Sequence, residues 1–195
     1  MSIKSILIVG VGGQGTLLAS RLLGNALVTT GYDVKVSEVH GMSQRGGSVI
    51  TYVRYADGED KVASPIIDLG EADVILSFEL LEAARYLPYL KKGGTIVSST
   101  QRIDPMPVIT GQAEYPDEIA AKLMAKGARV IAVDALSLAE DAGSAKAVNV
   151  VLLGLLSQHL DIKREVWLDT IKTGVPEKFR EMNLAAFDKG CSIDD

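Results

Sequence analysis

The first thirty residues contain the pattern that most restricts the fold of this chain. A short apolar run at residues 3–9 leads directly into a glycine-rich loop at residues 10–15. A segment of helical periodicity follows at residues 16–30 and stops at Gly31. A continuous apolar run is typical of a strand buried on both faces. A strand that turns at once into a helix opens a βαβ unit, in which the next strand lies parallel to the first. The opening therefore predicts an α/β protein.

The rest of the chain continues this alternation. Further strands are predicted at residues 33–39, 48–55, 72–78, 95–99 and 129–133. Helices are predicted at residues 79–90, 117–126, 136–141, 145–160 and 176–187, with a further amphipathic helix around Trp167. Residues 101–116 hold three of the six prolines, which indicates irregular chain or an edge strand.

These elements predict a Rossmann-like α/β fold in a single domain, residues 1–195, with a mainly parallel sheet and helices on both faces. One pair of strands departs from the pattern. The loop between residues 33–39 and 48–55 is too short to hold a helical crossover, so this pair is the irregular part of the sheet. Trp167 is expected to anchor a core or an interface rather than to stack on a ligand.

Charge and residue usage exclude several classes of function. The net charge is −5 and the Lys and Arg residues are scattered, which argues against a nucleic-acid partner. Cys191 is the only cysteine, so this chain alone forms no disulfide and supplies too few thiolates for an iron–sulfur cluster. Two histidines argue against a zinc site. If the protein serves redox chemistry, its metal centres are expected on another chain.

The sequence also indicates a cellular location. No signal-peptide pattern stands at the N-terminus. The longest apolar stretch, at residues 147–156, is too short to cross a bilayer. We therefore expect a cytoplasmic protein without a membrane partner.

The loop at residues 10–15 fits the pattern G-x-G-x-x-G in its usual place between a strand and a helix. Glycines there allow a tight turn and close approach of a pyrophosphate, and the helix N-terminus offers N–H groups to an anion. Glu38 follows the last glycine by 23 residues, near the position of a ribose-binding acid. The predicted cofactor-binding residues are Gly10, Gly12, Gly13, Gln14, Gly15 and Glu38. The alternative is a loop that only makes a sharp turn.

A second loop carries a denser set of functional groups. It follows the strand at residues 33–39 and lies at the carboxyl end of that strand, where ligands of open α/β sheets collect. The predicted interface or active-site residues are His40, Gly41, Met42, Ser43, Gln44, Arg45, Gly46 and Gly47. Arg45 could clamp a carboxylate or phosphate with help from backbone N–H groups. The alternative is a surface turn whose polar groups bond one another.

Taken together, the two loops resemble a known family. Gly10-x-Gly12-Gly13-Gln14-Gly15, followed by the second loop, is similar to the gamma-type subunit of 2-oxoacid:ferredoxin oxidoreductases, and most of all to the beta subunit of the indolepyruvate type. The resemblance continues nearly to the end of the chain, through Ser64-Pro65-Ile66-Ile67, Glu71-Ala72-Asp73, Glu79-x-x-Glu82-Ala83, the segment at residues 149–154, and Asn183-x-x-Ala186-Phe187-x-x-Gly190.

The resemblance implies a function shared with another chain. A partner subunit would carry thiamine diphosphate, Mg²⁺ and iron–sulfur clusters. The complex would decarboxylate an aryl or other 2-oxoacid, pass the acyl group to coenzyme A, and reduce ferredoxin. This chain would hold no cofactor tightly, would supply no catalytic residue, would complete the active-site assembly and would help to seat coenzyme A. The isolated chain is predicted to be inactive.

A second hypothesis remains open on the residues alone. The chain could be a free-standing NAD(P)-binding Rossmann oxidoreductase. No Tyr-x-x-x-Lys pair or His–Asp pair is evident for substrate proton transfer, and the chain offers no second, substrate-binding domain. The preferred 2-oxoacid is not encoded here, because the substrate pocket is expected on the thiamine subunit.

Overall fold

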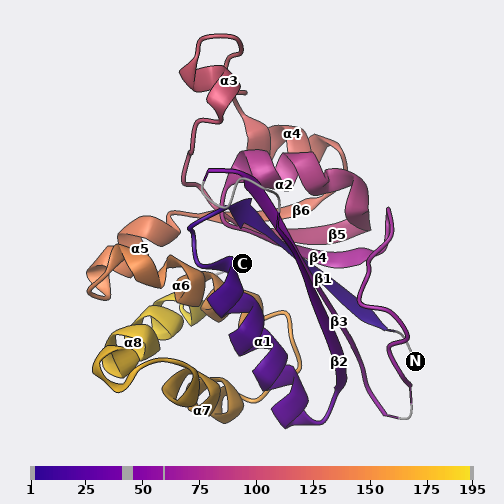
Figure 1. The fold of residues 1–195 in the computed structure, drawn as a ribbon, viewed down its shortest axis with the longest axis vertical. Helices are drawn as coiled ribbons and strands as arrows, with labels where there is room; N and C mark the ends of the chain where they lie inside the picture. Colours follow the sequence, from indigo (N-terminus) through magenta and orange to yellow (C-terminus); the bar gives the residue numbers. More distant parts are fainter. Residues whose placement is uncertain (1–2, 41–45, 59, 194–195) are drawn as a thin grey trace.

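The computed structural model describes residues 3–40, 46–58 and 60–193, with His40 described by its backbone only. Within these ranges six strands form one sheet in the order β2-β3-β1-β4-β5-β6 (Figure 1). Their bounds are β1 Lys4–Val11, β2 Asp33–His40, β3 Ser48–Ala56, β4 Ala72–Ser77, β5 Leu90–Ser99 and β6 Arg129–Val133.

The sheet is mainly parallel, as predicted. β1, β4, β5 and β6 run parallel to one another, whereas β3 runs antiparallel to both β1 and β2. The short loop after β2 explains this exception, because a connection without a crossover helix can join only antiparallel strands. β3 lies between β1 and β2, so β2 is parallel to β1 without touching it.

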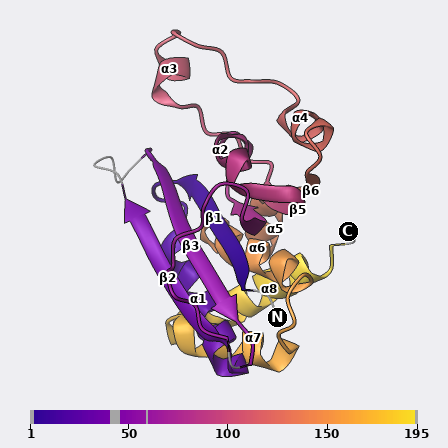
Figure 2. The same ribbon diagram turned by 90° about the vertical axis from the view of Figure 1, so that its right-hand side faces the viewer.

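Helices cover both faces of the sheet, which confirms the predicted architecture (Figures 1 and 2). The first face packs against α1, α5, α6, α7 and α8, and the second against α2 and α4. The helices are α1 Thr16–Thr30, α2 Leu80–Tyr86, α3 Met106–Ile109, α4 Ile119–Ala125, α5 Ala135–Asp141, α6 Val148–Ser157, α7 Arg164–Gly174 and α8 Arg180–Cys191, with 3-10 turns η1 Leu87–Tyr89, η2 Ala145–Ala147 and η3 Glu177–Phe179.

Two cores follow from the alternation of side chains along β1. Ile6 and Ile8 enter the core beneath the larger helical layer, and Leu7 and Val9 enter the core beneath α2 and α4. This explains why the first strand is apolar throughout. Trp167 is fully buried, with its ring centroid 5.6 Å from that of Phe187, so it is a core anchor.

Some boundaries differ from the predicted ones. The helix expected at residues 79–90 ends at Tyr86 and continues as η1, because Pro88 has no N–H to extend the helical ladder. β5 then begins at Leu90, five residues before the strand predicted at residues 95–99. Lys91 Nζ lies 2.7 Å from Asp73 Oδ1 and ties this segment to β4. Residues 101–116 are irregular chain around α3 rather than an edge strand.

In the described ranges, every helix is too short or too polar to cross a lipid bilayer.

Candidate functional site

The candidate site lies at the carboxyl edge of the sheet. Because β3 is antiparallel, its first residue meets the last residues of its neighbours: Val11 pairs with Ser48, and His40 pairs with Val49. The glycine loop after β1 and the described end of the second loop, Gly46 and Gly47, therefore lie side by side. The ends of β4, β5 and β6 face the same edge.

The two predicted loops are hydrogen-bonded to each other. Gly12 N–H donates to Gly47 O at 2.8 Å, and Gly46 N–H donates to Gly12 O at 3.3 Å. Gly13 and Gly46 have φ of 104° and 74°, a left-handed conformation that favours glycine. The structure thus joins the ends of the two motifs into one unit. The predicted residues Gly41, Met42, Ser43, Gln44 and Arg45 lie outside the described residues, as does the His40 side chain.

Gln14 stabilises the glycine loop from within. Its Oε1 accepts from Val11 N–H at 2.7 Å, and its Nε2 donates to Phe78 O at 3.0 Å and to Gln101 Oε1 at 3.4 Å. The side-chain amide therefore connects the ends of β1 and β4 with the segment after β5. In this arrangement Gln14 positions the loop and does not extend into solvent.

A cavity of about 420 Å³ opens beside this loop. It is lined by Gly13, Gln14, Gly15, Gln101, Leu136, Ala145, Lys146 and Val148. Gly15 is the N-cap of α1 and has no side chain to cap the helix, so the first N–H groups of α1 receive no side-chain acceptor from it. These N–H groups and the Lys146 ammonium make the cavity suited to an anionic group.

Asn149, on α6, also holds the glycine loop in place. It is 97% buried in the apolar helix α6, which follows from its 3% exposure. Its Nδ2 donates to Gly15 O at 3.3 Å, and its Oδ1 accepts from Val150 N–H at 2.9 Å. A Cβ on Gly15 would lie 2.8 Å from Asn149 Nδ2, so Gly15 permits close approach of α6. A polar residue inside an apolar helix was the signal in the sequence for such a partner.

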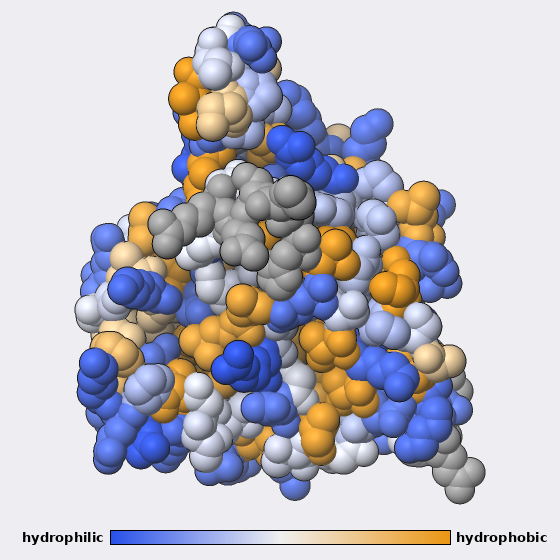
Figure 3. Space-filling view, in the orientation of Figure 1, coloured by the Kyte–Doolittle hydropathy of each residue, from blue (hydrophilic) through white to orange (hydrophobic). Residues whose placement is uncertain are grey.

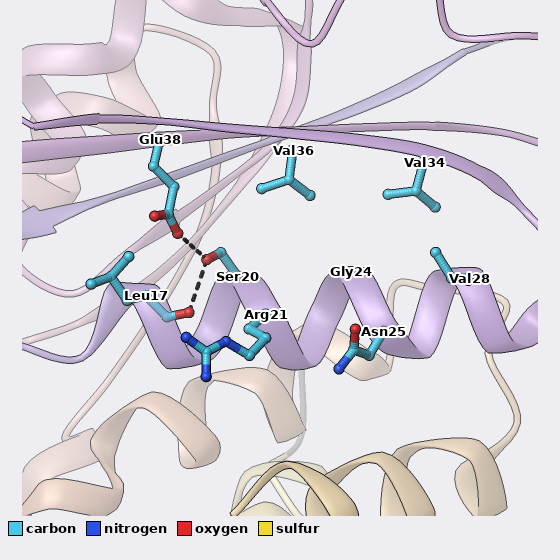
Figure 4. Close-up of a pocket in the computed structure, with 9 residues that line it drawn as sticks. All are labelled: Leu17, Ser20, Arg21, Gly24, Asn25, Val28, Val34, Val36 and Glu38. Atoms are coloured by element: carbon cyan, nitrogen blue, oxygen red, sulfur yellow. Dashed lines mark hydrogen bonds between the residues drawn. The ribbon is translucent and has the colours of Figure 1, made fainter.

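The structure places Glu38 away from the glycine loop. Ser20 Oγ donates to Glu38 Oε1 at 2.7 Å, and both side chains lie in a groove between α1 and β2 that Arg21 also lines (Figure 4). In a dinucleotide-binding Rossmann fold the acid stands on the strand next to β1. Here β3 occupies that place, so Glu38 lies one strand farther out. Its cofactor-binding role stays a prediction.

A pair of buried carboxylates lies at the same edge and was assigned no role from the sequence. Glu79 caps α2 by accepting from Glu82 N–H at 3.0 Å, and it also accepts from the Tyr115 hydroxyl. Glu82 accepts from Ser48 Oγ at 2.5 Å and pairs with Arg85 at 3.1 Å. Burial raises the pKa of Glu82, while Ser48 and Arg85 partly offset that increase. This cluster ties the start of β3 to α2.

In the described part of the chain, no three His, Cys, Asp or Glu side chains lie close enough to hold a metal ion. Around the cavity itself, the polar groups are the Gln14 and Gln101 amides, the N–H groups at the start of α1 and the Lys146 ammonium. These donors are suited to an anionic group.

A family model described as pyruvate ferredoxin/flavodoxin oxidoreductase matches residues 5–193. The chain belongs to this family. The match spans both loops and both cores, and it confirms the resemblance based on the two loops.

Curated relatives in this oxidoreductase family are similar over nearly their whole length. The indolepyruvate oxidoreductase subunit IorB of Thermococcus kodakarensis is 47% identical over 192 residues, which cover 95% of this chain and 93% of that protein. The subunit of the same name from Archaeoglobus fulgidus is 40% identical and covers 95% and 92%. The common gamma subunit of the pyruvate/ketoisovalerate oxidoreductases of Thermococcus litoralis is 24% identical over 170 residues, covering 87% and 83%.

Solved structures share the fold of this family member. The gamma subunit of a keto/oxoacid ferredoxin oxidoreductase from Geobacter sulfurreducens superposes with a TM-score of 0.70 at 23% identity, covering 96% of this chain and 95% of that one. A 2-oxoglutarate:ferredoxin oxidoreductase from Magnetococcus marinus superposes with a TM-score of 0.77 at 22% identity. That match covers 98% of this chain but only 31% of the other, so the same fold there is part of a longer chain.

Proposed function

We propose that this chain is the subunit without iron–sulfur clusters of a thiamine-diphosphate-dependent 2-oxoacid:ferredoxin oxidoreductase of the indolepyruvate type. The observation that carries the proposal is the 47% identity to a named indolepyruvate oxidoreductase subunit along nearly the whole of both chains. The single cysteine fits this assignment, because the cluster thiolates must then come from a partner chain.

The proposed reaction oxidatively decarboxylates a 2-oxoacid. The 2-oxoacid and coenzyme A give an acyl-CoA and carbon dioxide, and two electrons pass to ferredoxin. Thiamine diphosphate with Mg²⁺ and the iron–sulfur clusters on the partner subunit supply the carbon and electron chemistry. This chain contributes its carboxyl edge, which completes the active-site assembly.

Within that assembly, the cavity beside the glycine loop helps to seat coenzyme A. Coenzyme A carries several phosphate charges, and the cavity presents the uncapped start of α1 together with Lys146. Close packing of Gly15 against Asn149 keeps this helix start in place. Glu38 lies one strand away and beside Ser20, which argues against the alternative of an NAD(P) site built on the same glycines.

The second loop, from His40 to Gly47, is proposed to face the partner subunit. Its described end, Gly46 and Gly47, is bonded to Gly12, so a partner that contacts this loop also reaches the cavity. Arg45 is proposed to pair with a carboxylate or a cofactor phosphate there. Arg45→Ala should weaken assembly or turnover by about 2–5 kcal/mol. The melting temperature of the isolated chain should change little.

Reconstitution tests the function as a whole. The isolated chain, given thiamine diphosphate, Mg²⁺, coenzyme A, indolepyruvate and a viologen acceptor, should show no turnover. The complex with the thiamine subunit should reduce the acceptor in a reaction that depends on coenzyme A. Turnover by the isolated chain, or tight fluorescence-detected binding of NAD(P)H to it, would refute the proposal.

Lys146 tests the seating of coenzyme A. Lys146→Gln removes a cation from the cavity, and the KM for coenzyme A in the complex should rise about five- to tenfold, because a partly solvated charged contact is lost. Lys92→Gln serves as a control, since Lys92 is exposed near the start of β5, at the opposite edge of the sheet. An unchanged KM for coenzyme A in Lys146→Gln would contradict the proposal that this cavity helps to seat coenzyme A.

A further inference from the structure

Residues 100–118 form an arm that leaves the sheet at the end of β5 and returns at the start of α4. Figures 1 and 2 show from two directions that α3 projects beyond the carboxyl edge of the sheet and away from the other helices. The arm is thus on the same edge as the cavity and the two loops. Gln101, at its base, lines the cavity itself.

The tip of the arm is apolar and uncovered. Met106 is 67% exposed and Ile109 is 66% exposed, and no residue of α3 is buried. The two side chains are three positions apart on one turn of helix, so they lie on one face. Apolar surface is visible on this projection in Figure 3. Neither residue belongs to either hydrophobic core of the described chain.

Backbone hydrogen bonds close the tip of the arm on itself. Thr110 N–H donates to Met106 O at 2.9 Å, and Gln112 N–H donates to Pro107 O at 2.8 Å. Pro105 and Pro107 restrict the backbone dihedrals on either side of Met106. Little conformational entropy remains to be lost when another surface covers such a tip, which favours binding.

The base of the arm is held by a specific set of contacts. The Tyr115 hydroxyl donates to Glu79, which is buried and caps α2. The Arg102 guanidinium lies 4.3 Å from the centre of the Tyr115 ring and bonds Asp104 at 2.6 Å. Tyr115 thus ties the returning end of the arm to α2, and Arg102 ties the two ends of the arm to each other.

We infer that this arm docks the chain onto the larger, thiamine-bearing subunit by inserting Met106 and Ile109 into an apolar hollow on that subunit. The inference rests on the proposed function. The arm borders the carboxyl edge, which is proposed to face the partner subunit. One continuous surface of that subunit would therefore contact the arm, the second loop and the cavity. In the 2-oxoglutarate:ferredoxin oxidoreductase from Magnetococcus marinus the same fold makes up 31% of a longer chain, so there it is covalently joined to further parts of an oxidoreductase.

A double variant tests the arm. Met106→Ser/Ile109→Ser should weaken binding of this chain to the thiamine subunit at least about tenfold, because exposed apolar anchors at interface centres contribute most to affinity. The control is Leu69→Ser/Ile66→Ser, which removes two exposed apolar side chains at the opposite edge of the sheet; Leu69 is 68% exposed. The control should bind normally, and both isolated variants should keep the wild-type melting temperature.

The outcomes separate the arm from the proposed function. If the wild-type chain binds the thiamine subunit and the arm variant binds equally well, the arm inference is wrong while the function stands. Equal weakening by the control would also contradict it, since the effect would not be specific to the arm. If the wild-type chain does not bind the thiamine subunit at all, the proposed function itself fails.

A measurement on the wild-type chain keeps the inference testable if the arm variant does not fold. Amide hydrogen exchange of residues 106–113 should slow when the thiamine subunit is added, and unchanged exchange there would overturn the inference. Sedimentation of the isolated wild-type chain addresses self-association. A dimer that the arm variant dissociates would replace the proposed partner with a second copy of this chain.

Discussion

Glycine serves opposite purposes in two regions of this molecule. Where α6 crosses α8, Gly154 and Gly190 bring two helix backbones together, and a Cβ on either would lie well inside 3.0 Å of a backbone carbonyl oxygen of the other helix. At the carboxyl edge, Gly13 has open space around it and a φ of 104°. Gly154 and Gly190 leave room for a neighbouring backbone, whereas Gly13 allows a left-handed backbone conformation. Substitutions should therefore fail for different reasons in the two places.

Gly190→Ala should have the largest effect on stability. The new methyl group would collide with the Val151 carbonyl oxygen, and backbone cannot move aside as a side chain can. We expect a loss of about 3 kcal/mol or more in the free energy of unfolding, measured by urea denaturation. Gly174→Ala is the matched control, because its Cβ would meet only Leu22 Cδ2 at 2.5 Å, the end of a flexible side chain. Equal losses in the two variants would contradict the backbone-contact explanation.

Asn149→Ala should have the next largest effect and connects the two regions. The residue lies on α6 but bonds the glycine loop through Gly15 O. Removing a buried hydrogen-bonding group should cost about 1–3 kcal/mol of folding free energy. In the complex it should also raise the KM for coenzyme A, because the start of α1 loses its support. A loss of stability without any change in that KM would show that Asn149 stabilises the core but does not support the coenzyme A site.

Gly13→Ala should lower the free energy of unfolding less than the two preceding variants do, but it should weaken the binding of coenzyme A more. A left-handed conformation penalises alanine by about 1–2 kcal/mol. Gly31→Ala is a close control, since Gly31 has the same φ of 104°, equally open surroundings, and a place at the other end of α1. Both variants should lose similar stability in thermal unfolding, while only Gly13→Ala should weaken binding of coenzyme A to the complex. Equal effects of the two variants on coenzyme A binding would contradict a role of the glycine loop in the proposed site.

Glu82→Gln should have the smallest effect and one that depends on pH. Burial raises the pKa of this carboxyl in the folded state above its value in the unfolded chain. Its contribution to stability is therefore fully present below the ordinary glutamate pKa, and it is lost as pH rises through the raised pKa. Glutamine can keep a bond to Ser48 without ionising. The wild-type chain should lose stability relative to this variant across that pH range, as measured by denaturation at a series of pH values. A difference that does not vary with pH would contradict this assignment.

Local features were predictable because their causes lie within a few residues. The apolar run of β1, the glycines after it and the periodic α1 specify a strand, a turn and a helix in that order. The short loop before Ser48 likewise predicted an irregular strand pair, which the structure shows as the antiparallel β3. Asn149 interrupts the apolar stretch at residues 147–156, and a polar side chain buried there needs a hydrogen-bond partner, which the structure supplies as Gly15 O.

Other features could not be read locally. The spacing of Glu38 from Gly15 suits a ribose-binding acid, but strand order places β3 between them. Lys91 and the following glycines look like the end of a helix, yet pairing with β4 draws them into a strand. The prolines at residues 101–116 indicated irregular chain without showing that Tyr115 would reach Glu79.

The sequence by itself determined the fold class, the family and the positions of the two loops along the chain, because periodicity and turn residues act over short distances. Only the tertiary structure decided that Gly12 meets Gly47, that Lys146 joins the glycine loop at one cavity, and that α3 stands beyond the sheet. These contacts depend on which strands become neighbours. That choice is made by burial of apolar faces over the whole chain, and no local pattern records it.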